Sequence, residues 1–412
     1  MNVLIVTQYF WPENFRVNEL VAGFVTRGHA VTVLTGQPNY PGGSFFPGYG
    51  WRGPRSEEAY GARIMRVPMF ARRSAGALRL FLNYLSFAFF ASIAARFRLR
   101  GPIDAIIVFE PSPITVGIPA VVASRRFSAP ILFWVLDLWP DSLTAAGAVQ
   151  SPAVLASVAR LVRWIYGNCT RVLVPSRGFV ANVEHHGTPT SRIRYFPNWM
   201  ESDFDSVATG AETLRPSPAG FNIVFAGNIG AAQGFPEIIA AAERVAISCP
   251  KVCWIIAGDG RMSDWARAEA TRRGLADRMV FLGQQPPSSM PDLFACADAL
   301  LVSLKADPVF SRTIPGKVQS YLGAGRPILA MLDGEGARIV TEAGAGLTCA
   351  AGDWEALASN VQALVATGTA ERTEMGGRGR AYALREFSRE PLLDRLEAWC
   401  AEAIADFERG EE

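Results

Sequence analysis

Short runs of apolar and β-branched residues alternate with longer stretches of helical periodicity along most of the chain. In the first half these runs occupy residues 3–6, 31–34, 103–109, 131–136 and 172–174. The same rhythm resumes at 222–226, 252–257, 280–282, 299–303 and 328–331. Strands that alternate with helices are typical of parallel sheets with crossover helices. We therefore predict an α/β fold with two Rossmann-like units.

The chain is expected to divide in its middle. Its 412 residues exceed what one hydrophobic core usually organises. Residues 197–220 contain three prolines with Ser, Thr and Gly and little periodicity, which is the composition of a linker. We place the boundary near residue 210, with domains at 1–205 and 206–388. A last helix within 389–412 lies beyond the second unit and is free to pack back across the first.

Composition and charge exclude several classes of protein. Charged residues make up 19% of the chain and the formal net charge is +2, so no basic field favours nucleic acid as a partner. The six cysteines form no CxxC pair and have no matching histidine spacing for zinc, which fits buried thiols in a reducing cytoplasm. The first seven residues lack a basic region and a cleavage site, so we interpret them as a strand.

An uncharged run at 80–95 predicts a helix, near 78–98, that is apolar around most of its circumference. At about 1.5 Å per residue this run is too short to span ~30 Å of hydrocarbon comfortably. No carboxylate occurs between Glu58 and Asp104, whereas arginines flank the run on both sides. These features indicate a helix at the surface of an anionic membrane, with arginines on lipid phosphates. The alternative is a core helix whose arginines are merely solvated.

A glycine-rich turn at 225–234 follows an apolar strand and precedes a helical stretch. Backbone amides at such a helix start can hold a diphosphate. The alternative is that the glycines only allow the helix to pack closely against the strand.

Several segments together resemble retaining glycosyltransferases of family 4. They are QYFWPENFRVNE at 8–19, RGHAVTVLTGQPNYPGG at 27–43, DLWPD at 137–141 and PGKVQSYLGAGRP at 315–327. Within that family, the first two segments and LNYLSF at 82–87 are most similar to WbuB-type enzymes of bacterial O-antigen and capsule assembly, which are assigned as N-acetyl-L-fucosamine transferases. The resemblance extends from residue 1 to about 387. It implies a GT-B architecture of two facing Rossmann-like domains, with the nucleotide sugar held mainly by the second.

The resemblance implies a donor site in the second domain, although several usual residues are replaced. Asn228 and Gln233 stand where the family usually carries Arg and Lys, and Arg312 and Ser320 stand where many members carry two glutamates. Lys317 matches the lysine of the family motif and can approach a phosphate. Ribose is then held by backbone or by Ser320. The expected donor-binding residues are Gly227, Asn228, Gly230, Gln233, Gly234, Gly258, Gly260, Arg312, Lys317 and Ser320.

In the first domain, Leu136 occupies the place of the histidine that family members often carry. Asp137 and Asp141 then remain as carboxylates that can orient a sugar hydroxyl or accept the proton of the acceptor. The alternative for Asp137 is a capping role. Glu13 is an alternative base. Asn14, Arg16 and Asn18 follow the first strand, where a doubly wound sheet presents its ligand, and are expected to bind the acceptor.

We expect no metal site and no cofactor. His185 and His186 are adjacent and cannot readily share an ion, and His29 is expected to be structural. Asp203 and Asp205 have the Asp-x-Asp spacing of metal-dependent glycosyltransferases, but they lie in the expected linker.

The resemblance therefore implies a UDP-sugar-dependent hexosyltransferase that moves a sugar, expected to be N-acetyl-L-fucosamine, to a saccharide on polyprenyl diphosphate. We expect this enzyme in the cytoplasm, at the inner face of the plasma membrane. Two alternatives stay open. One is a UDP-sugar epimerase, which can share the GT-B architecture. The other is an inactive nucleotide-sugar-binding partner in a polysaccharide assembly complex.

Overall fold

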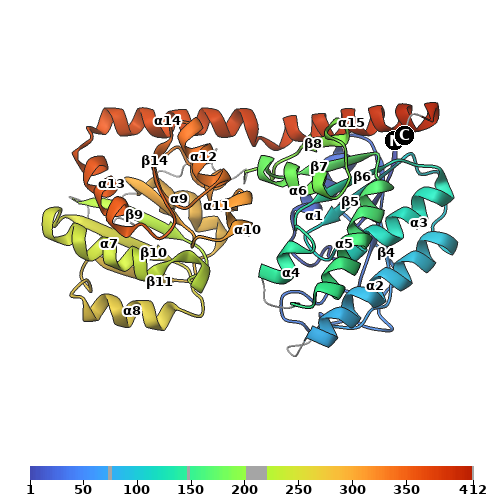
Figure 1. Cartoon of the computed structure of the whole chain (residues 1–412), viewed down its shortest axis with the longest axis horizontal. Helices are drawn as coiled ribbons and strands as arrows, with labels where there is room; N and C mark the ends of the chain where they lie inside the picture. The colour runs from blue at the N-terminus through green and yellow to red at the C-terminus, as the bar shows by residue number, and fades with distance from the viewer. Residues whose placement is uncertain (73–76, 146–148, 201–219, 411–412) are drawn as a thin grey trace. The chain divides into compact units, whose positions relative to one another are not determined.

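The computed structural model describes residues 1–72, 77–145, 149–200 and 220–410, and it divides into two compact units. Unit 1 comprises Met1–Pro197 together with Glu390–Glu412, and unit 2 comprises Asn198–Arg389. The expected boundary near residue 210, and the Asp203–Asp205 motif, lie outside the described residues. Figure 1 shows the elements of both units.

Unit 1 is built on an eight-stranded sheet of order β3-β4-β2-β1-β5-β6-β7-β8, parallel except for the β3–β4 pair. The strands are β1 Asn2–Val6, β2 Ala30–Thr35, β3 Ser56–Ala59, β4 Ala62–Arg66, β5 Ala105–Glu110, β6 Ile131–Val135, β7 Arg171–Val174 and β8 Ile193–Tyr195. The central strands β5 and β6 are buried along their whole length because helices cover both faces of a parallel sheet. The outer strand β3, with sequence SEEA, is not predicted from the hydrophobic pattern because it is a short polar edge strand.

The helices of unit 1 connect these strands as crossovers. They are α1 Arg16–Thr26, α2 Ala77–Phe97, α3 Gly117–Phe127, α4 Asp141–Ala145, α5 Pro152–Gly167 and α6 Val180–His185. Helix α2 packs along α3, and in Figure 1 the two run side by side. Its inner face contributes Phe87, Ala91 and Ala95 to the main core of the unit. The packing against α3 therefore leaves the opposite face of α2 without a cover inside unit 1.

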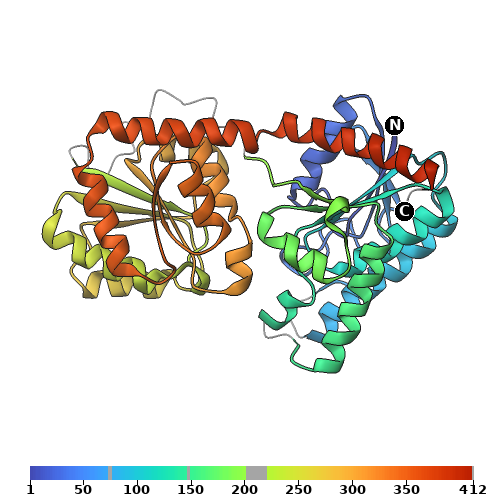
Figure 2. The same ribbon diagram turned by 45° about the horizontal axis from the view of Figure 1, so that its top comes forward.

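The last helix, α15 Arg389–Arg409, belongs largely to unit 1 and follows its edge, as Figures 1 and 2 show. Arg171 of β7 forms an ion pair with Asp406, and the rings of Phe196 and Trp399 meet edge to face at 6.0 Å. Arg27, after α1, pairs with three carboxylates of this helix. The expected return of the C-terminal helix to the first domain is confirmed.

Unit 2 contains a fully parallel six-stranded sheet of order β11-β10-β9-β12-β13-β14. Its strands are β9 Phe221–Ala226, β10 Val252–Ala257, β11 Met279–Gly283, β12 Ala299–Ser303, β13 Ile328–Met331 and β14 Gly346–Cys349. Its helices are α7 Phe235–Ser248, α8 Ser263–Arg272, α9 Met290–Ala295, α10 Pro308–Arg312, α11 Gly316–Gly323, α12 Glu335–Glu342, α13 Trp354–Ala366 and α14 Thr369–Glu386. Apolar clusters fill both faces of the sheet. The predicted α/β fold with two Rossmann-like sheets is confirmed.

Candidate active site

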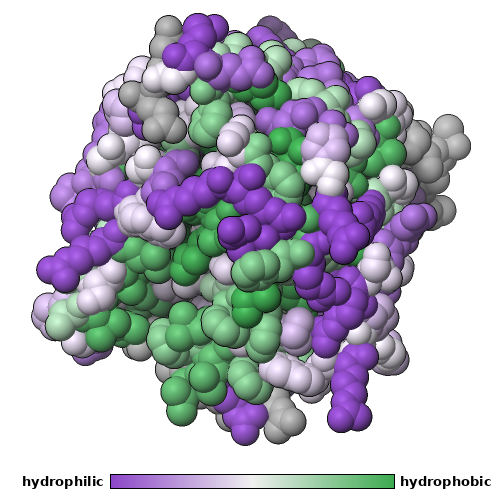
Figure 3. All heavy atoms as spheres, turned by 90° about the vertical axis from the view of Figure 1, so that its right-hand side faces the viewer, coloured by the Kyte–Doolittle hydropathy of each residue, from purple (hydrophilic) through white to green (hydrophobic). Residues whose placement is uncertain are grey.

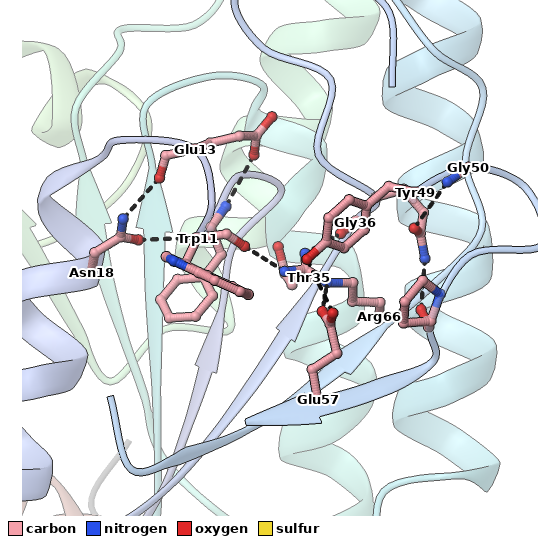
Figure 4. A network of polar contacts seen from close by, with 12 residues as sticks. Trp11, Glu13, Asn18, Thr35, Gly36, Tyr49, Gly50, Glu57 and Arg66 are labelled. Carbon is pink, nitrogen blue, oxygen red and sulfur yellow. Dashed lines mark hydrogen bonds and ion pairs between the residues drawn. The ribbon is translucent and has the colours of Figure 1, made fainter. Parts of the chain in front are cut away.

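The loop that follows β1 in unit 1 is organised by the buried carboxylate of Glu13 (Figure 4). One oxygen accepts hydrogen bonds from the amides of Asn39 at 2.8 Å and Tyr40 at 2.7 Å. The other accepts from the amide of Phe10 at 3.2 Å. Burial raises the pKa of Glu13 to about 7, although these three amides act in the opposite direction. Because its oxygens are already engaged, Glu13 is better placed to join the loops after β1 and β2 than to accept a proton.

Arg66 holds the same loop through a hydrogen bond to its backbone. Its side chain is fully buried, forms an ion pair with Glu57, and donates to the carbonyls of Trp11 and Gly36. Figure 4 shows the guanidinium beneath the Tyr49 ring, whose centroid lies 5.0 Å away. A buried arginine with an ion-pair partner and two carbonyl acceptors is a rigid support for the residues it holds.

The three expected acceptor-binding residues have different surroundings. Asn18 is buried, and its side-chain amide accepts from Trp11 N at 3.1 Å and donates to the Glu13 carbonyl at 2.8 Å. The expectation that Asn18 contacts a ligand is therefore replaced by a role in shaping the loop. Asn14 is exposed and Arg16, which begins α1, is half-buried. These two residues are still candidates for contact with an acceptor.

A pair of buried carboxyl groups lies at the ends of β5 and β6. Glu110 is the last residue of β5, and one of its oxygens accepts from the amide of Asp137 at 3.3 Å. Burial, and then the charge of Asp137, raise the pKa of Glu110 well above its usual range. Burial also raises the pKa of Asp137, whereas hydrogen bonds from Ser142, Ser112 and Trp139 lower it. This arrangement favours a protonated Glu110 beside an ionised Asp137.

Glu110 was not predicted from the sequence, where it merely ends an apolar run. Its second oxygen is buried and has no hydrogen-bond partner among the described residues. Asp141, four residues after Asp137, begins α4 and accepts a hydrogen bond from Asn182 at 3.0 Å. Asp137 is thus joined to a second carboxyl group, and Asp141 to the side-chain amide of Asn182.

Two glycine loops of unit 2 pack backbone against backbone at the carboxyl ends of β9 and β10. A Cβ atom on Gly258 would lie 1.9 Å from the Gly227 carbonyl oxygen, and one on Gly260 would lie 2.4 Å from that of Ile229. The amide of Gly227 donates to Ala257 O at 2.8 Å, and that of Gly230 donates to the Gln233 side chain at 3.1 Å. The expectation that these two amides are open to a diphosphate is therefore not met, because both are already paired. The glycines primarily allow close packing.

Lys317 supplies the cation of this site. It is the second residue of α11, and its ammonium lies 3.7 Å from the centroid of the Phe225 ring, at the end of β9. The nitrogen is buried and has no hydrogen-bond partner among the described residues. Burial lowers the pKa of Lys317 to about 7. A desolvated ammonium without an acceptor is well suited to pair with an anionic ligand.

A cavity of about 520 Å³ opens at the same glycine loops. Asn228 lines it and donates weakly to Gln233 at 3.4 Å, so these two residues form a neutral pair where the resemblance would place cations. Gln284 and Gln285, after β11, also line it and were not predicted from the sequence. Their amides can both donate and accept hydrogen bonds, as recognition of a nucleobase edge requires.

The remaining expected donor-site residues are dispersed. The Ser320 hydroxyl donates to Gly316 O at 3.2 Å within its own helix. Because its proton is already used there, the expected role of Ser320 in binding the ribose is weakened. Arg312 ends α10, and Gly234 adopts φ +62° before α7. A Cβ on Gly234 would lie 3.2 Å from a Glu237 oxygen and 3.4 Å from Ser303 Oγ. Both of those oxygens are buried without a partner among the described residues, so they can serve ligand hydroxyls.

Among the residues described, no group of three or more His, Cys, Asp or Glu side chains is placed to hold a metal ion. Independence from metal stays a prediction.

Helix α2 is longer than the uncharged run from which it was predicted. Its 21 residues correspond to about 31 Å, so the expectation that it is too short to span hydrocarbon is not met on length alone. By length and composition, the stretch Leu78–Phe97 of this helix is apolar enough to cross a membrane. Its mean hydropathy is 1.5, and 39% of it is buried within unit 1. Its outer face exposes large apolar side chains, namely Leu78, Phe81, Leu82, Leu85, Phe89, Ile93 and Phe97. On the face of the protein drawn in Figure 3, hydrophobic side chains form a patch that hydrophilic ones border.

Comparisons with known proteins find glycosyltransferase domains in both halves of the chain. A family model described as a glycosyl transferase 4-like domain matches residues 14–199, and one described as glycosyl transferases group 1 matches residues 220–367. A protein of Escherichia coli (strain K12), provisionally named colanic acid biosynthesis glycosyl transferase WcaI, is 28% identical over 345 residues, which are 79% of this chain and 82% of that protein.

Solved structures with the same fold are more distant in sequence. Sucrose-phosphate synthase from Thermosynechococcus elongatus matches with a TM-score of 0.74 and 16% identity, over 98% of this chain and 99% of that one. Anabaena Alr3699/HepE in complex with UDP matches with a TM-score of 0.71 and 14% identity, over 98% and 100%. At these identities the likeness establishes the fold alone, which is the GT-B arrangement of two Rossmann-like sheets.

Proposed function

We propose, from the premise that this chain is a glycosyltransferase with a 4-like domain followed by a group 1 domain, that it transfers a hexosyl residue from a UDP-sugar to a saccharide on polyprenyl diphosphate. The proposed role is in the assembly of a bacterial surface polysaccharide. The E. coli relative named for colanic acid biosynthesis supports this role. The proposed donor is UDP-N-acetyl-L-fucosamine, which rests on the sequence resemblance.

The observation that carries the proposal is the buried ammonium of Lys317 beside the glycine loops of unit 2. A diphosphate at this position would give the ammonium the acceptor that it lacks. The adjoining cavity of about 520 Å³ is within the ~300–1,000 Å³ range of small-molecule sites. The UDP complex of HepE, which shares the fold, supports a UDP-sugar as the donor.

In the proposed reaction, the bond between the sugar anomeric carbon and the diphosphate oxygen breaks, and the acceptor hydroxyl forms a new bond to the same face of that carbon. The hydroxyl proton passes to an oxygen of the departing diphosphate. Lys317 stabilises the negative charge that develops on UDP. Asp137 accepts a hydrogen bond from the acceptor hydroxyl and orients it, because it is the ionised member of its pair with Glu110.

We further propose that unit 1 meets the membrane through the outer face of α2. Its inner face is committed to the core, so the helix would lie along the surface of the bilayer. The exposed arginines Arg79, Arg96, Arg98 and Arg100 flank the apolar face and can contact anionic headgroups.

The test is transfer by the purified full chain from a panel of UDP-sugars to a polyprenyl-diphosphate-linked N-acetylhexosamine, followed by UDP release and mass spectrometry of the lipid. A mass increase that matches one donor identifies the sugar. UDP-sugar binding without product would favour the inactive partner, and a changed UDP-sugar without transfer would favour the epimerase.

A further inference from the structure

A second cavity, of about 590 Å³, lies in unit 1 beside the first turns of α2. Seven of its eight lining side chains are apolar, and the eighth is Arg79. Its volume is within the ~300–1,000 Å³ range of small-molecule sites, but so apolar a lining suits a hydrocarbon rather than a sugar. All its lining residues belong to unit 1, and it shares none with the cavity at the glycine loops of unit 2.

Aromatic side chains form one wall of this cavity. The Trp51 and Phe70 rings lie 5.1 Å apart and tilted by 32°, and Trp51 meets Phe90 edge to face at 5.4 Å. Trp51 is nevertheless 44% exposed and Phe70 is 50% exposed. These large apolar side chains already surround the cavity, yet they are exposed to solvent. Such an arrangement indicates a surface that a ligand covers when it binds.

Two arginines belong to the segments that form the cavity, and one of them contacts the loops at the carboxyl edge of the sheet. Arg79 lines it, and Arg72 follows Phe70 by two residues. The Arg72 guanidinium lies 3.4 Å from the Tyr9 hydroxyl and 5.4 Å from the centroid of the Tyr40 ring, in the loops that Glu13 joins. No carboxylate interrupts the sequence from 59 to 103. The ligand that complements this surface has a hydrocarbon chain and an anionic group at one end.

Helix α2 also carries a residue that interacts with the paired carboxyl groups. Leu82 lines the cavity, and Tyr84, two residues later, is half-buried with its ring 6.2 Å from that of Trp139. Burial raises the pKa of Tyr84, and the charge of Asp137 acts in the same direction, whereas Arg72 and a hydrogen bond with Ser112 lower it. Tyr84 is therefore close enough to interact electrostatically with both Arg72 and Asp137. An anionic group held at Arg72 would lie within electrostatic reach of Tyr84, which also responds to the charge of Asp137.

We propose that the cavity beside α2 binds the first part of the hydrocarbon chain of a prenyl diphosphate, with the diphosphate at Arg72 and Arg79 and the attached sugar directed toward Asp137. This inference rests on the proposed function, which it deepens by giving the acceptor lipid a binding site of its own. It separates two uses of α2. Its N-terminal part binds the lipid of the substrate, and the outer face beyond it contacts the bilayer.

The test is calorimetric binding of geranylgeranyl diphosphate to the full chain, with inorganic diphosphate as the comparison and with a matched pair of α2 variants. Leu82 lines the cavity and is 41% exposed, whereas Ile93 lies outside the lining and is 40% exposed. We expect Leu82→Gln to weaken binding at least about tenfold, because it removes apolar contact with the chain, and Ile93→Gln to change it less than about twofold. Inorganic diphosphate should bind at least about tenfold more weakly than the prenyl compound.

A second measurement guards against a variant that fails to fold. A photoactivatable prenyl diphosphate should label wild-type peptides that contain Met69, Phe70 or Leu78. Equal effects of the two substitutions, equal affinity for inorganic diphosphate, or label spread over Phe89–Phe97 would each overturn the cavity as the site. Prenyl binding without transfer to any acceptor would refute the proposed function and leave the cavity standing. Sugar transfer without binding of the prenyl compound would refute the cavity as the lipid site and leave the proposed function standing.

Discussion

Lys317 occupies the space that a side chain at residue 227 would need. A Cβ atom built on Gly227 would lie 2.6 Å from Lys317 Cε and 2.9 Å from its Nζ, and Gly227 adopts φ +131°. The glycine at the end of β9 thus permits the approach of a cation to the Phe225 ring.

Gly227→Ala should therefore displace Lys317 and strain the backbone. We expect UDP-sugar affinity and turnover to fall by more than about tenfold, because the ammonium would leave the position from which it meets the diphosphate. Gly274→Ala is the control, since Gly274 also has a positive φ, +71°, but nothing lies within 4 Å of an added Cβ. If both variants lose activity equally, backbone strain alone explains the effect.

The titration of Lys317 should appear in the pH dependence of donor binding. Its pKa is lowered by burial to about 7, and a bound diphosphate favours the protonated form, so affinity should fall as pH rises above 7. Lys317→Arg should flatten this dependence, because arginine stays charged. Lys317→Ala should lower turnover by more than about tenfold. Fluorescence titrations with UDP between pH 6 and about 9 check the slope, and unchanged turnover of the alanine variant would remove the assigned role.

The lowered pKa of Lys317 also predicts how the free energy of unfolding changes with pH. Between pH 7 and the ordinary value of 10.5, the unfolded chain binds a proton at Lys317 that the folded chain does not. The contribution of this lysine to the free energy of unfolding should therefore rise with pH across that window and level off above it. Lys317→Met should abolish this contribution, which urea unfolding at several pH values can measure as a difference between variant and wild type.

These residues show which parts of the site were predictable from the sequence. The glycines of 227–234 could be identified from their order along the chain, because a strand, a turn and a helix are local features, whereas Lys317 was identified from its match to the family motif. That Gly227 makes room for Lys317 was not predictable, since the contact joins residues 90 positions apart. Glu110 was missed for the same reason, because its partner Asp137 lies 27 positions later, just after the next strand.

The fold was more accessible than the site. Central strands such as β5 and β10 are buried on both faces, and their continuous apolar runs mark them directly. The edge strand β3 and the short β14 lack that signal. For α2 the sequence predicts a helix but not which side faces the core, because apolar residues surround it. The structure resolves this by packing Phe87 inward and leaving Phe89 exposed.

The carboxyl pair predicts unlike outcomes for two conservative substitutions. Glu110→Gln mimics the protonated acid, keeps an acceptor for the Asp137 amide, and should leave turnover within about threefold of wild type at neutral pH. Asp137→Asn removes the charged member and should lower turnover by about a hundredfold or more. Steady-state assays of both variants check the assignment. The opposite order of effects would mean that Glu110 carries the charge.

Chelation tests the expected independence from metal. If Lys317 neutralises the departing diphosphate, EDTA should leave turnover unchanged and added Mg²⁺ should not raise it, because no step requires a bound ion. The assay follows UDP release before and after dialysis against chelator. Activity that is lost on dialysis and restored by a divalent ion would refute this role for Lys317 as the sole neutralising charge.

The outer face of α2 should determine binding to membranes independently of the cavity. Phe89 and Phe97 are 60% and 70% exposed and do not line the cavity, so replacing both with Gln should leave the core intact. Loss of two aromatic side chains from the bilayer surface should lower the partition coefficient on anionic vesicles by about a hundredfold. Co-sedimentation with phosphatidylglycerol vesicles measures this change. Turnover with a short-chain acceptor in detergent should stay near that of wild type, because neither residue contacts the substrate. Vesicle binding that is unaffected by the double substitution but abolished at high salt would instead assign membrane contact to the arginines alone.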